Sequence, residues 1–285
     1  MEFDVRHPEV IDAVRRALAE DIGSGDLTTN ATVDEELMAT GRFIARAAMT
    51  VCGVELIELV FEELGGVDFL GIHLHSGERA AAGDVLATVR GKARTLLTGE
   101  RVALNFQQRL SGIATLTRRH ADAIAGTGCK VLDTRKTTPG LRRLEKWATV
   151  CGGATNHRIG LFDAILIKNN HITAAGGVEK ALRRVHDAGV PPGVEVEIEV
   201  RTRGELEEAL TFGADHLLLD NLTPDEAAEW IHFIGGRAKV ELSGGMRLER
   251  MREYASTGAD FISVGALTHS AVAVDINFRV SLETA

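Results

Sequence analysis

Seven cationic side chains between Thr134 and Ile172 are the clearest sign of chemistry in this sequence. Only Glu145 and Asp163 accompany them as acids, although the whole 285-residue chain carries a formal net charge of −9. The cations are Arg135, Lys136, Arg142, Arg143, Lys146, Arg158 and Lys168. A local surplus of this kind on an acidic protein predicts a pocket for a strongly anionic small molecule, and it argues against a general nucleic-acid binder.

Two turns near the C-terminal end have the composition of phosphate-binding loops. Ser243, Gly244 and Gly245 follow the apolar run of "KVELS", and Gly265 repeats the arrangement in "SVGALTHS". Free backbone N–H groups between a strand end and a helix suit a phosphate, and phosphate sites at the last two units are a known device of α/β barrels. The pair of turns therefore predicts a phosphorylated ligand.

Two carboxylates stand where predicted strands end. Glu199 closes "VEVEIEV", in which Glu195, Glu197 and Glu199 alternate with apolar residues and so share one face, and Asp220 closes "HLLLD". Beside a phosphate site, such carboxylates can hold ribose hydroxyls, bind Mg²⁺ or stabilise a developing oxocarbenium ion. The residues alone leave these three roles open.

The histidines give weaker signals. His157 adjoins Arg158 in "TNHRIG", which favours a functional role, whereas His171 in "KNNHI" is as compatible with a structural role. His73 and His75 share one face of a short strand, and without a third nearby ligand they indicate a surface hairpin and not a metal site.

A regular alternation of strands and helices has to position these groups. The pattern predicts strands at 130–133, 164–168, 194–200, 216–220, 239–243 and 260–264, with helices at about 140–151, 177–188, 203–212, 223–234 and 247–257. Such alternation indicates a parallel sheet, and six units are too few for a complete eight-stranded barrel. We predict an open or incomplete α/β barrel, with a doubly wound sheet as the alternative. Strand C-termini converge in a barrel, so the polar groups would meet at one mouth.

The first third of the chain has a different, mixed pattern of short strands and amphipathic helices. A long helix is predicted to begin near Thr98 and to connect the two parts. Cys52, Cys129 and Cys151 show neither zinc-binding nor disulfide-framework spacing, and we find no signal peptide and no membrane span. These features favour a cytoplasmic location.

A series of ordered motifs then resembles one known family along nearly the whole chain. The motifs are "EDIGSGDLTT", "ERVALNFQQRLSGIAT", "DTRKTTPG", "TNHRIGLFDAILIKNNHI", "LLLDN", "SGG" and "ISVGALTHS". They are similar to those of quinolinate phosphoribosyltransferase, also called nicotinate-nucleotide pyrophosphorylase (carboxylating). The resemblance implies an N-terminal α/β sandwich domain at 1–112, an open α/β barrel at 113–272, and a C-terminal tail at 273–285 that returns to the first domain.

The resemblance also implies a reaction. Quinolinate and phosphoribosyl pyrophosphate would give nicotinate mononucleotide, pyrophosphate and CO₂, with Mg²⁺, as the entry into NAD synthesis. Both substrates are heavily anionic, which would account for the cations. The family further implies a homodimer or a higher homo-oligomer, and neither a nucleic-acid nor a membrane partner.

Roles for individual residues follow from the same resemblance. On the quinolinate carboxylates it places Arg101 of a neighbouring subunit, Arg135, His157, Arg158 and Lys168. As catalytic residues it indicates Lys136, Lys168, Glu199 and Asp220, of which Glu199 and Asp220 would also face Mg²⁺. On the 5-phosphate it places Ser243, Gly244, Gly245, Gly265 and His269. One departure is Asn169, where the family pattern has an acid.

Three alternatives remain open from the sequence. A paralogue of the same fold, associated with molybdenum transport, shares "GDLTT" but should lose the quinolinate-binding set. A Schiff-base aldolase would use Lys168 at the end of its strand. A non-catalytic anion-binding protein would gain little from Glu199 and Asp220 beside an anionic ligand.

Overall fold

The computed structural model describes residues 3–282 and folds into two compact units. The first unit consists of Met1–Arg118, Thr137–Gly153 and Ala266–Ala285, and the second of Arg119–Lys136 and Ala154–Gly265. The chain therefore crosses between the units several times. In particular, residues 137–153, which the alternating pattern assigns to the barrel, belong to the first unit.

An antiparallel four-stranded sheet is the centre of the first unit. Its order is β12-β1-β5-β3, with β1 at Met38–Ala45, β3 at Phe69–Ile72, β5 at Val85–Lys92 and β12 at Ile276–Leu282. Strand β12 pairs with β1 in a register that sets Gly41 opposite Val280, and the rings of Phe43 and Phe278 pack 4.7 Å apart. The C-terminal segment thus becomes an edge strand of this sheet, while residues 283–285 of the expected tail lie outside the described residues.

Helices pack against this sheet because their apolar residues recur at helical spacing. Helix α1 (Pro8–Ile22) has Pro8 in its first turn, an N-cap at His7, and buried Val10, Val14 and Leu18. The remaining elements of the unit are α2 (Leu27–Thr32), β2 (Met49–Thr50), α3 (Leu56–Glu62), β4 (Arg79–Ala80), α5 (Arg142–Cys151) and α11 (Ala266–His269). Among these, α2 and α11 were not predicted.

Helix α4 (Ala93–Ala123) is 31 residues long and begins five residues before the predicted start at Thr98. Gly112 lies where the chain leading to β12 passes this helix. A Cβ atom added at Gly112 would lie 2.3 Å from the carbonyl oxygen of Val272 and 3.0 Å from the Cα of Ala273. Only glycine allows the two backbones to approach this closely.

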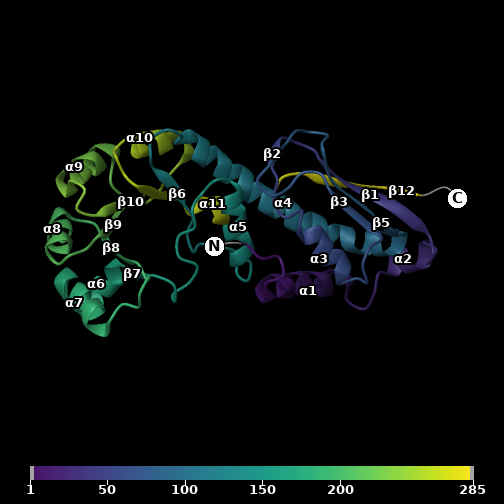
Figure 1. Cartoon of the computed structure of the whole chain (residues 1–285), viewed down its shortest axis with the longest axis horizontal. Coiled ribbons are helices and arrows are strands. Elements are labelled where there is room, and N and C mark those ends of the chain that lie inside the picture. Colours follow the sequence, from purple (N-terminus) through teal and green to yellow (C-terminus); the bar gives the residue numbers. More distant parts are fainter. Residues whose placement is uncertain (1–2, 283–285) are drawn as a thin grey trace. The chain divides into compact units, whose positions relative to one another are not determined.

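The second unit contains a six-stranded, all-parallel sheet of order β6-β11-β10-β9-β8-β7 (Figure 1). The strands are β6 (Lys130–Leu132), β7 (Ile165–Ile167), β8 (Val196–Val200), β9 (His216–Asp220), β10 (Lys239–Ser243) and β11 (Phe261–Ser263). The last strand, β11, pairs with the first, β6, as in a closed barrel, whereas β7 pairs only with β8. The predicted open α/β barrel is confirmed, and its opening lies between β6 and β7.

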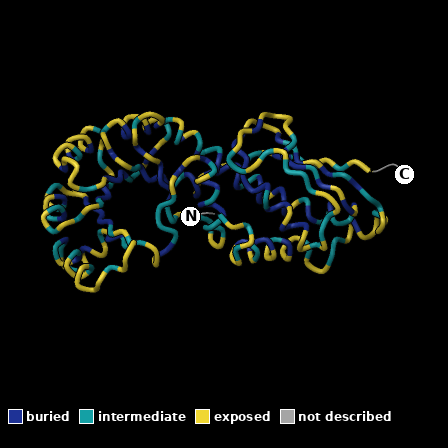
Figure 2. The backbone as a smooth tube through the Cα atoms, viewed as in Figure 1, coloured by how far each residue is buried: buried dark blue, intermediate teal, exposed yellow. Residues whose placement is uncertain are grey.

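Helices surround the outer side of this sheet, with the strands buried inside them (Figures 1 and 2). They are α6 (Asn169–Ala175), α7 (Val178–Ala188), α8 (Arg203–Thr211), α9 (Pro224–Ile234) and α10 (Met251–Ala255), which follows a 3-10 turn at Leu248–Arg250. Thr202 and Thr223 cap α8 and α9 through reciprocal bonds with the glutamate three residues later. Helix α6 was not predicted. Within residues 3–282 no helix has both the length and the apolar character that a membrane span requires.

We expect Gly112→Ala to destabilise the protein by about 2 kcal/mol, because the added methyl group meets backbone atoms that cannot move independently. Gly204→Ala is the matched control, since Gly204 lies in helix α8 with open space around its Cα. The control should gain about 0.5 kcal/mol from helix propensity. Urea denaturation of both variants measures the two changes, and equal effects at the two positions would contradict the close approach at Gly112.

Candidate functional site

Four of the seven predicted cations line one pocket in the second unit. Arg135 and Lys136 follow β6, Arg158 belongs to the segment before β7, and Lys168 directly follows β7. The pocket has a volume of about 230 Å³ and also includes His157, Leu166, Leu218, Glu241, Ser243 and Ser263. Because the strands are parallel, their carboxyl ends meet here, as expected for an α/β barrel.

The guanidinium groups of this pocket are held close to one another. Burial lowers the pKa of Arg158, and the like charge of Arg135 lowers it further, while Asp163 acts in the opposite direction. Arg158 also donates a hydrogen bond from Nη1 to the carbonyl oxygen of Ala164 at 3.2 Å. Bringing like charges together costs free energy. The pocket is therefore suited to an anion, whose negative charge offsets the repulsion between the guanidinium groups.

The segment that carries His157 and Arg158 is positioned by Asp133. This carboxylate is fully buried at the end of β6 and accepts hydrogen bonds from Asn156 Nδ2 at 2.6 Å and from the backbone N–H of His157 at 2.9 Å. Thr155 extends the sheet by one parallel bridge to Leu132 of β6. The segment therefore lies along the open edge of the barrel.

Glu199 and Asp220 lie on neighbouring strands and share a cation that was not predicted. Arg201 Nη2 lies 2.6 Å from Glu199 Oε1 and 3.6 Å from Asp220 Oδ2, and Lys168 Nζ lies 4.0 Å from Glu199 Oε2. Glu199 is 5 % exposed. Two carboxylates this close to each other form a donor set of hard oxygens that fits Mg²⁺, in competition with the Arg201 guanidinium.

A tight corner joins Asp220 to the predicted phosphate turn. Asn221 has a left-handed backbone with φ 61°, donates its N–H to the carbonyl oxygen of Ser243 at 3.0 Å, and donates from Nδ2 to Asp220 Oδ2 at 2.7 Å. Gly244 has φ 100°, and a Cβ atom there would lie 2.2 Å from Asn221 Oδ1. Ser243, Gly244 and Gly245 are thus held next to Asp220, and Asn221 is a positioning residue that sequence reasoning missed.

Other predicted site residues are distributed as follows. Gly265 ends the second unit just before α11, whereas His269, at the end of α11, belongs to the first unit and has its Nδ1 2.6 Å from Ser270 Oγ. Arg101 also belongs to the first unit, on an exposed position of α4. His171 accepts the N–H of Lys168 at 2.8 Å and so completes the cap of α6, which is a structural role.

The remaining three predicted cations do not line this pocket. Arg142 donates from Nε to Thr137 Oγ1 at 3.0 Å, Arg143 pairs with Glu9 at 2.9 Å, and Lys146 is 2 % exposed within α5. All three belong to the first unit. The interpretation of all seven cations as one pocket was therefore wrong for these residues, because α5 packs with the first unit.

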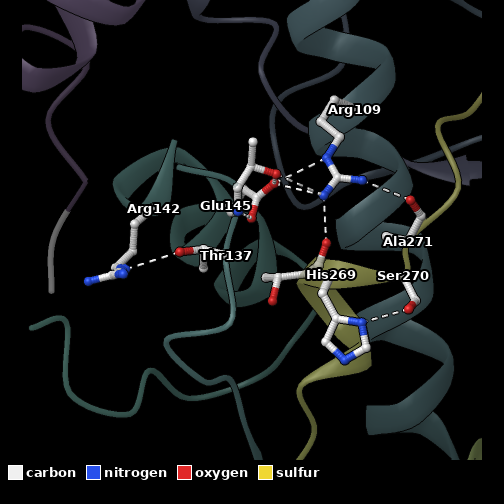
Figure 3. A network of polar contacts seen from close by, with 9 residues as sticks. Arg109, Thr137, Arg142, Glu145, His269, Ser270 and Ala271 are labelled. Atoms are coloured by element: carbon white, nitrogen blue, oxygen red, sulfur yellow. Dashed lines mark hydrogen bonds and ion pairs between the residues drawn. The ribbon is translucent and has the colours of Figure 1, made fainter. Parts of the chain in front are cut away.

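Helix α5 is held in the first unit by a buried ion pair that the sequence did not reveal (Figure 3). Glu145 is fully buried, and its Oε1 accepts from Arg109 Nη2 at 2.8 Å and from Thr138 Oγ1 at 2.7 Å. Arg109 also donates to the carbonyl oxygens of Thr268 and Ala271, at 2.5 and 2.8 Å. One guanidinium thus joins α4, α5 and the segment that leads to β12.

Next to the pocket, and sharing His157 and Glu241 with it, the barrel interior holds a cluster of acids and histidines. His157 Nε2 lies 3.1 Å from Glu197 Oε2 and 3.5 Å from Glu241 Oε2, and His216 Nε2 lies 3.5 Å from Glu197 Oε1. His157, Glu197 and Glu241 are close enough to hold a metal ion. However, His157 Nδ1 accepts the N–H of Arg158 at 2.7 Å, so Nε2 carries the ring proton and is not available as a metal ligand.

Glu241 is the main residue of this cluster that sequence reasoning missed. The available signal was an acid in the interior of the apolar strand "KVELS", at a position that alternates with apolar residues toward the barrel interior. Burial, and then the neighbouring Glu197, raise the pKa of Glu241 to about 8.

The geometry defines a class of protein. An open α/β barrel with a cationic pocket, adjacent carboxylates and a glycine-rich turn at the carboxyl ends of its strands is an enzyme site for an anionic, phosphorylated small molecule. Its donors suit carboxylate and phosphate groups, and its carboxylates suit a developing positive charge.

Comparison with known proteins identifies the family. Residues 26–111 match the N-terminal domain and residues 113–279 the C-terminal domain of quinolinate phosphoribosyl transferase. A nicotinate-nucleotide pyrophosphorylase [carboxylating] of Mycobacterium leprae is 42% identical, over 96% of this chain and 97% of the relative. The structure of the nicotinate-nucleotide pyrophosphorylase from Francisella tularensis is 37% identical and superposes with a TM-score of 0.91, covering 98% of this chain and 100% of that one. The chain belongs to the quinolinate phosphoribosyl transferase family and is a phosphoribosyltransferase.

We expect Glu145→Gln to lower the free energy of unfolding by about 3 kcal/mol, because it removes the charge that the guanidinium of Arg109 faces and turns an amide toward the N–H of Thr138. The matched control is Glu9→Gln, which breaks the surface pair with Arg143 and should change stability by less than about 0.5 kcal/mol. Thermal and urea unfolding measure both variants. A loss at Glu145 no larger than at Glu9 would contradict the central role of the buried pair.

Proposed function

We propose that this protein transfers the phosphoribosyl group of phosphoribosyl pyrophosphate to quinolinate, with release of pyrophosphate and CO₂, to form nicotinate mononucleotide. The observation that carries the proposal is the convergence of four cations and two carboxylates at the carboxyl ends of the barrel strands. The family membership and the names of the relatives support it, since a tobacco relative 38% identical to the chain is a quinolinate phosphoribosyltransferase [decarboxylating].

Quinolinate has two adjacent carboxylates on a planar ring. Arg135 and Arg158 both line the pocket with guanidinium groups, which suits bidentate bonds to such a pair, and Lys168 adds a point charge. His157 lines the same pocket. We therefore assign these four residues to the binding of quinolinate, with the arginines supplying its orientation.

Glu199 and Asp220 would act on the ribose. As pyrophosphate leaves, positive charge develops on C1 and the ring oxygen of the sugar, and nearby carboxylates lower the free energy of that state. We propose that Lys136 faces the departing pyrophosphate. Glu199 and Asp220 would also hold Mg²⁺, which when bound offsets the charge of the pyrophosphate.

Decarboxylation needs no further base from the protein. Attack of the pyridine nitrogen on C1 of the ribose makes that nitrogen cationic. When CO₂ departs from C2 of the pyridine ring, the adjacent positive charge therefore stabilises the electron pair left on that carbon. A proton from solvent then completes the product. The chain contributes orientation here, because Arg135 and Arg158 hold the carboxylates in place.

The remaining assignments follow from the sequence motifs. Ser243, Gly244, Gly245 and Gly265 would bind the 5-phosphate through backbone N–H groups, with His269 nearby. Arg101 is exposed on α4, which suits contact with the site of a second subunit in a homodimer or a larger oligomer. We place the enzyme in the cytoplasm.

A Schiff-base aldolase is a less suitable description of the site. The side chain of Lys168 is 52% exposed and faces Glu199 at 4.0 Å. This differs from the desolvated pocket that activates a Schiff-base lysine.

An assay of the purified protein with quinolinate, phosphoribosyl pyrophosphate and Mg²⁺ tests the function directly. We expect CO₂ and nicotinate mononucleotide in equal amounts, and no product when nicotinate replaces quinolinate, because the arginines are matched to two carboxylates. Product from neither substrate would overturn the proposal and favour the molybdenum-associated paralogue.

We expect Glu199→Gln to lower kcat by about 100-fold with little change in the KM for quinolinate, because we assign its charge to the ribose and Mg²⁺ and not to the quinolinate carboxylates. Arg158→Lys should instead raise the KM for quinolinate by about tenfold, since a bidentate contact is lost. The matched control is Glu195→Gln, whose exposed side chain lies just before β8, and its kinetics should equal those of the wild type. Reversal of the kcat and KM effects would contradict the assigned roles.

A further inference from the structure

Two cysteines that are far apart in the sequence meet inside the first unit. Cys52 lies shortly after the short strand β2, and Cys151 is the last residue of α5. Their side chains are in hydrogen-bond contact, thiol to thiol. The third cysteine, Cys129, belongs to the second unit. The fold therefore brings together two thiols whose spacing in the sequence does not indicate a pair.

Helix α4 holds the backbone of both cysteines. Ser111 Oγ accepts the N–H of Cys52 at 2.9 Å and donates to the carbonyl oxygen of the same residue at 3.0 Å. Seven residues further along α4, which is two turns and therefore the same face, Arg118 Nη2 donates to the carbonyl oxygen of Cys151 at 3.2 Å. Both segments are thus fixed against one surface, and the contact between the thiols does not depend on side-chain rotation alone.

Two glycines allow these segments to pack closely. A Cβ atom added at Gly152, directly after Cys151, would lie 2.4 Å from the Cβ of Thr117 on α4. Gly77 donates its N–H to the carbonyl oxygen of Val51 at 2.8 Å, and a Cβ atom there would lie 3.8 Å from the carbonyl oxygen of Cys151. Gly77 thus adjoins the segments of both cysteines, which places their backbones close to each other.

The thiols differ in their access to solvent. Cys52 is 0% exposed, and burial, followed by the neighbouring thiol of Cys151, raises the pKa of Cys52 well above its usual range. Burial likewise raises the pKa of Cys129 to about 12. Cys151 is only half-buried. Because oxidants react with accessible thiolates, Cys151 is the cysteine that they reach first.

We propose that Cys151 is a redox-modification site and that its oxidation leads to a reversible Cys52–Cys151 disulfide within the first unit. The Cys151 thiolate attacks one sulfur of a small disulfide such as glutathione disulfide, and one glutathione leaves. Cys52 then loses its proton, and its sulfur attacks Sγ of Cys151 and expels the second glutathione. The two protein thiols lose two electrons and two protons, and one glutathione disulfide becomes two glutathione thiols.

The bond should change stability and not the chemistry of the cationic pocket, which other residues line. It joins the segment after β2 to the C-terminal end of α5 and closes a long loop of chain. Such a bond restricts the unfolded chain far more than the folded one. Under reducing conditions both thiols stay reduced, so the disulfide forms only when the oxidised form of the small thiol accumulates.

Peptide mapping by mass spectrometry, after the folded full chain is incubated with glutathione disulfide, tests the bond. We expect one linked peptide pair that contains Cys52 and Cys151, is about 2 Da lighter than the two reduced peptides, and separates in dithiothreitol. Cys52→Ala should instead accumulate glutathione on Cys151. Cys151→Ser should react about tenfold more slowly, because only buried thiols remain. The matched control Cys129→Ser should form the linked pair as the wild type does.

Two results of the mapping would overturn the proposal. One is glutathione on Cys151 of the wild type without the linked pair, and the other is a linked pair that forms only in urea or that contains Cys129.

Thermal unfolding tests the effect of the bond. The oxidised wild type and oxidised Cys129→Ser should unfold about 5 °C above their reduced forms, whereas Cys52→Ala treated in the same way should gain nothing. A linked pair without a rise in unfolding temperature would overturn the stabilising role.

Discussion

Neutralisation of buried acids is the constraint on which the catalytic unit depends. Four carboxyl groups are buried on or beside the strands of one parallel sheet: Asp133, Glu197, Glu199 and Glu241. Two of them show how such a charge is paired. Asp133 accepts backbone and amide donors, and Glu199 faces Arg201 and Lys168. Buried acids are costly unless they are paired in this way, so the arrangement of donors around them determines where the functional cations lie.

The need to pair buried acids affects function at the opening of the barrel. Between β6 and β7 the sheet is not closed, and the segment 155–158 runs along the free edge of β6, held by Asp133. His157 and Arg158 reach the pocket from this segment, whereas Lys168 comes from the opposite edge. A closed barrel would fill this position with a paired strand, so the incomplete sheet is what admits cations from both sides.

The first unit also contains a deeply buried acid, and a single ion pair neutralises it. Glu145 is as deeply buried as Asp133, and Arg109 satisfies it while also donating to two backbone carbonyl oxygens. Because these partners come from three separate segments, the pair also explains why α5 belongs to the first unit although it follows β6 in the chain. The pairing of a buried charge thus determines which unit a helix packs with, as well as the geometry of the site.

Much of this protein could be predicted from local pattern. The strands at His216–Asp220 and Lys239–Ser243 were predicted to the residue, because apolar runs between turn residues have few alternatives. The ordered motifs were sufficient to indicate the family, and strand-end chemistry indicated Arg135, Lys168 and Glu199. These features depend only on residues that are neighbours in the sequence.

What the sequence did not contain were the partners of groups that meet only after folding. Arg201 was not assigned to Glu199, Glu241 was not recognised as buried beside Glu197, and Asn221 gave no sign of its left-handed backbone. The sequence by itself determined which strands and helices form and which chemistry their ends carry, since periodicity and turn composition are local. Only the tertiary structure decided which charges share a pocket and which acids lose contact with water, because both depend on distances between residues far apart in the chain.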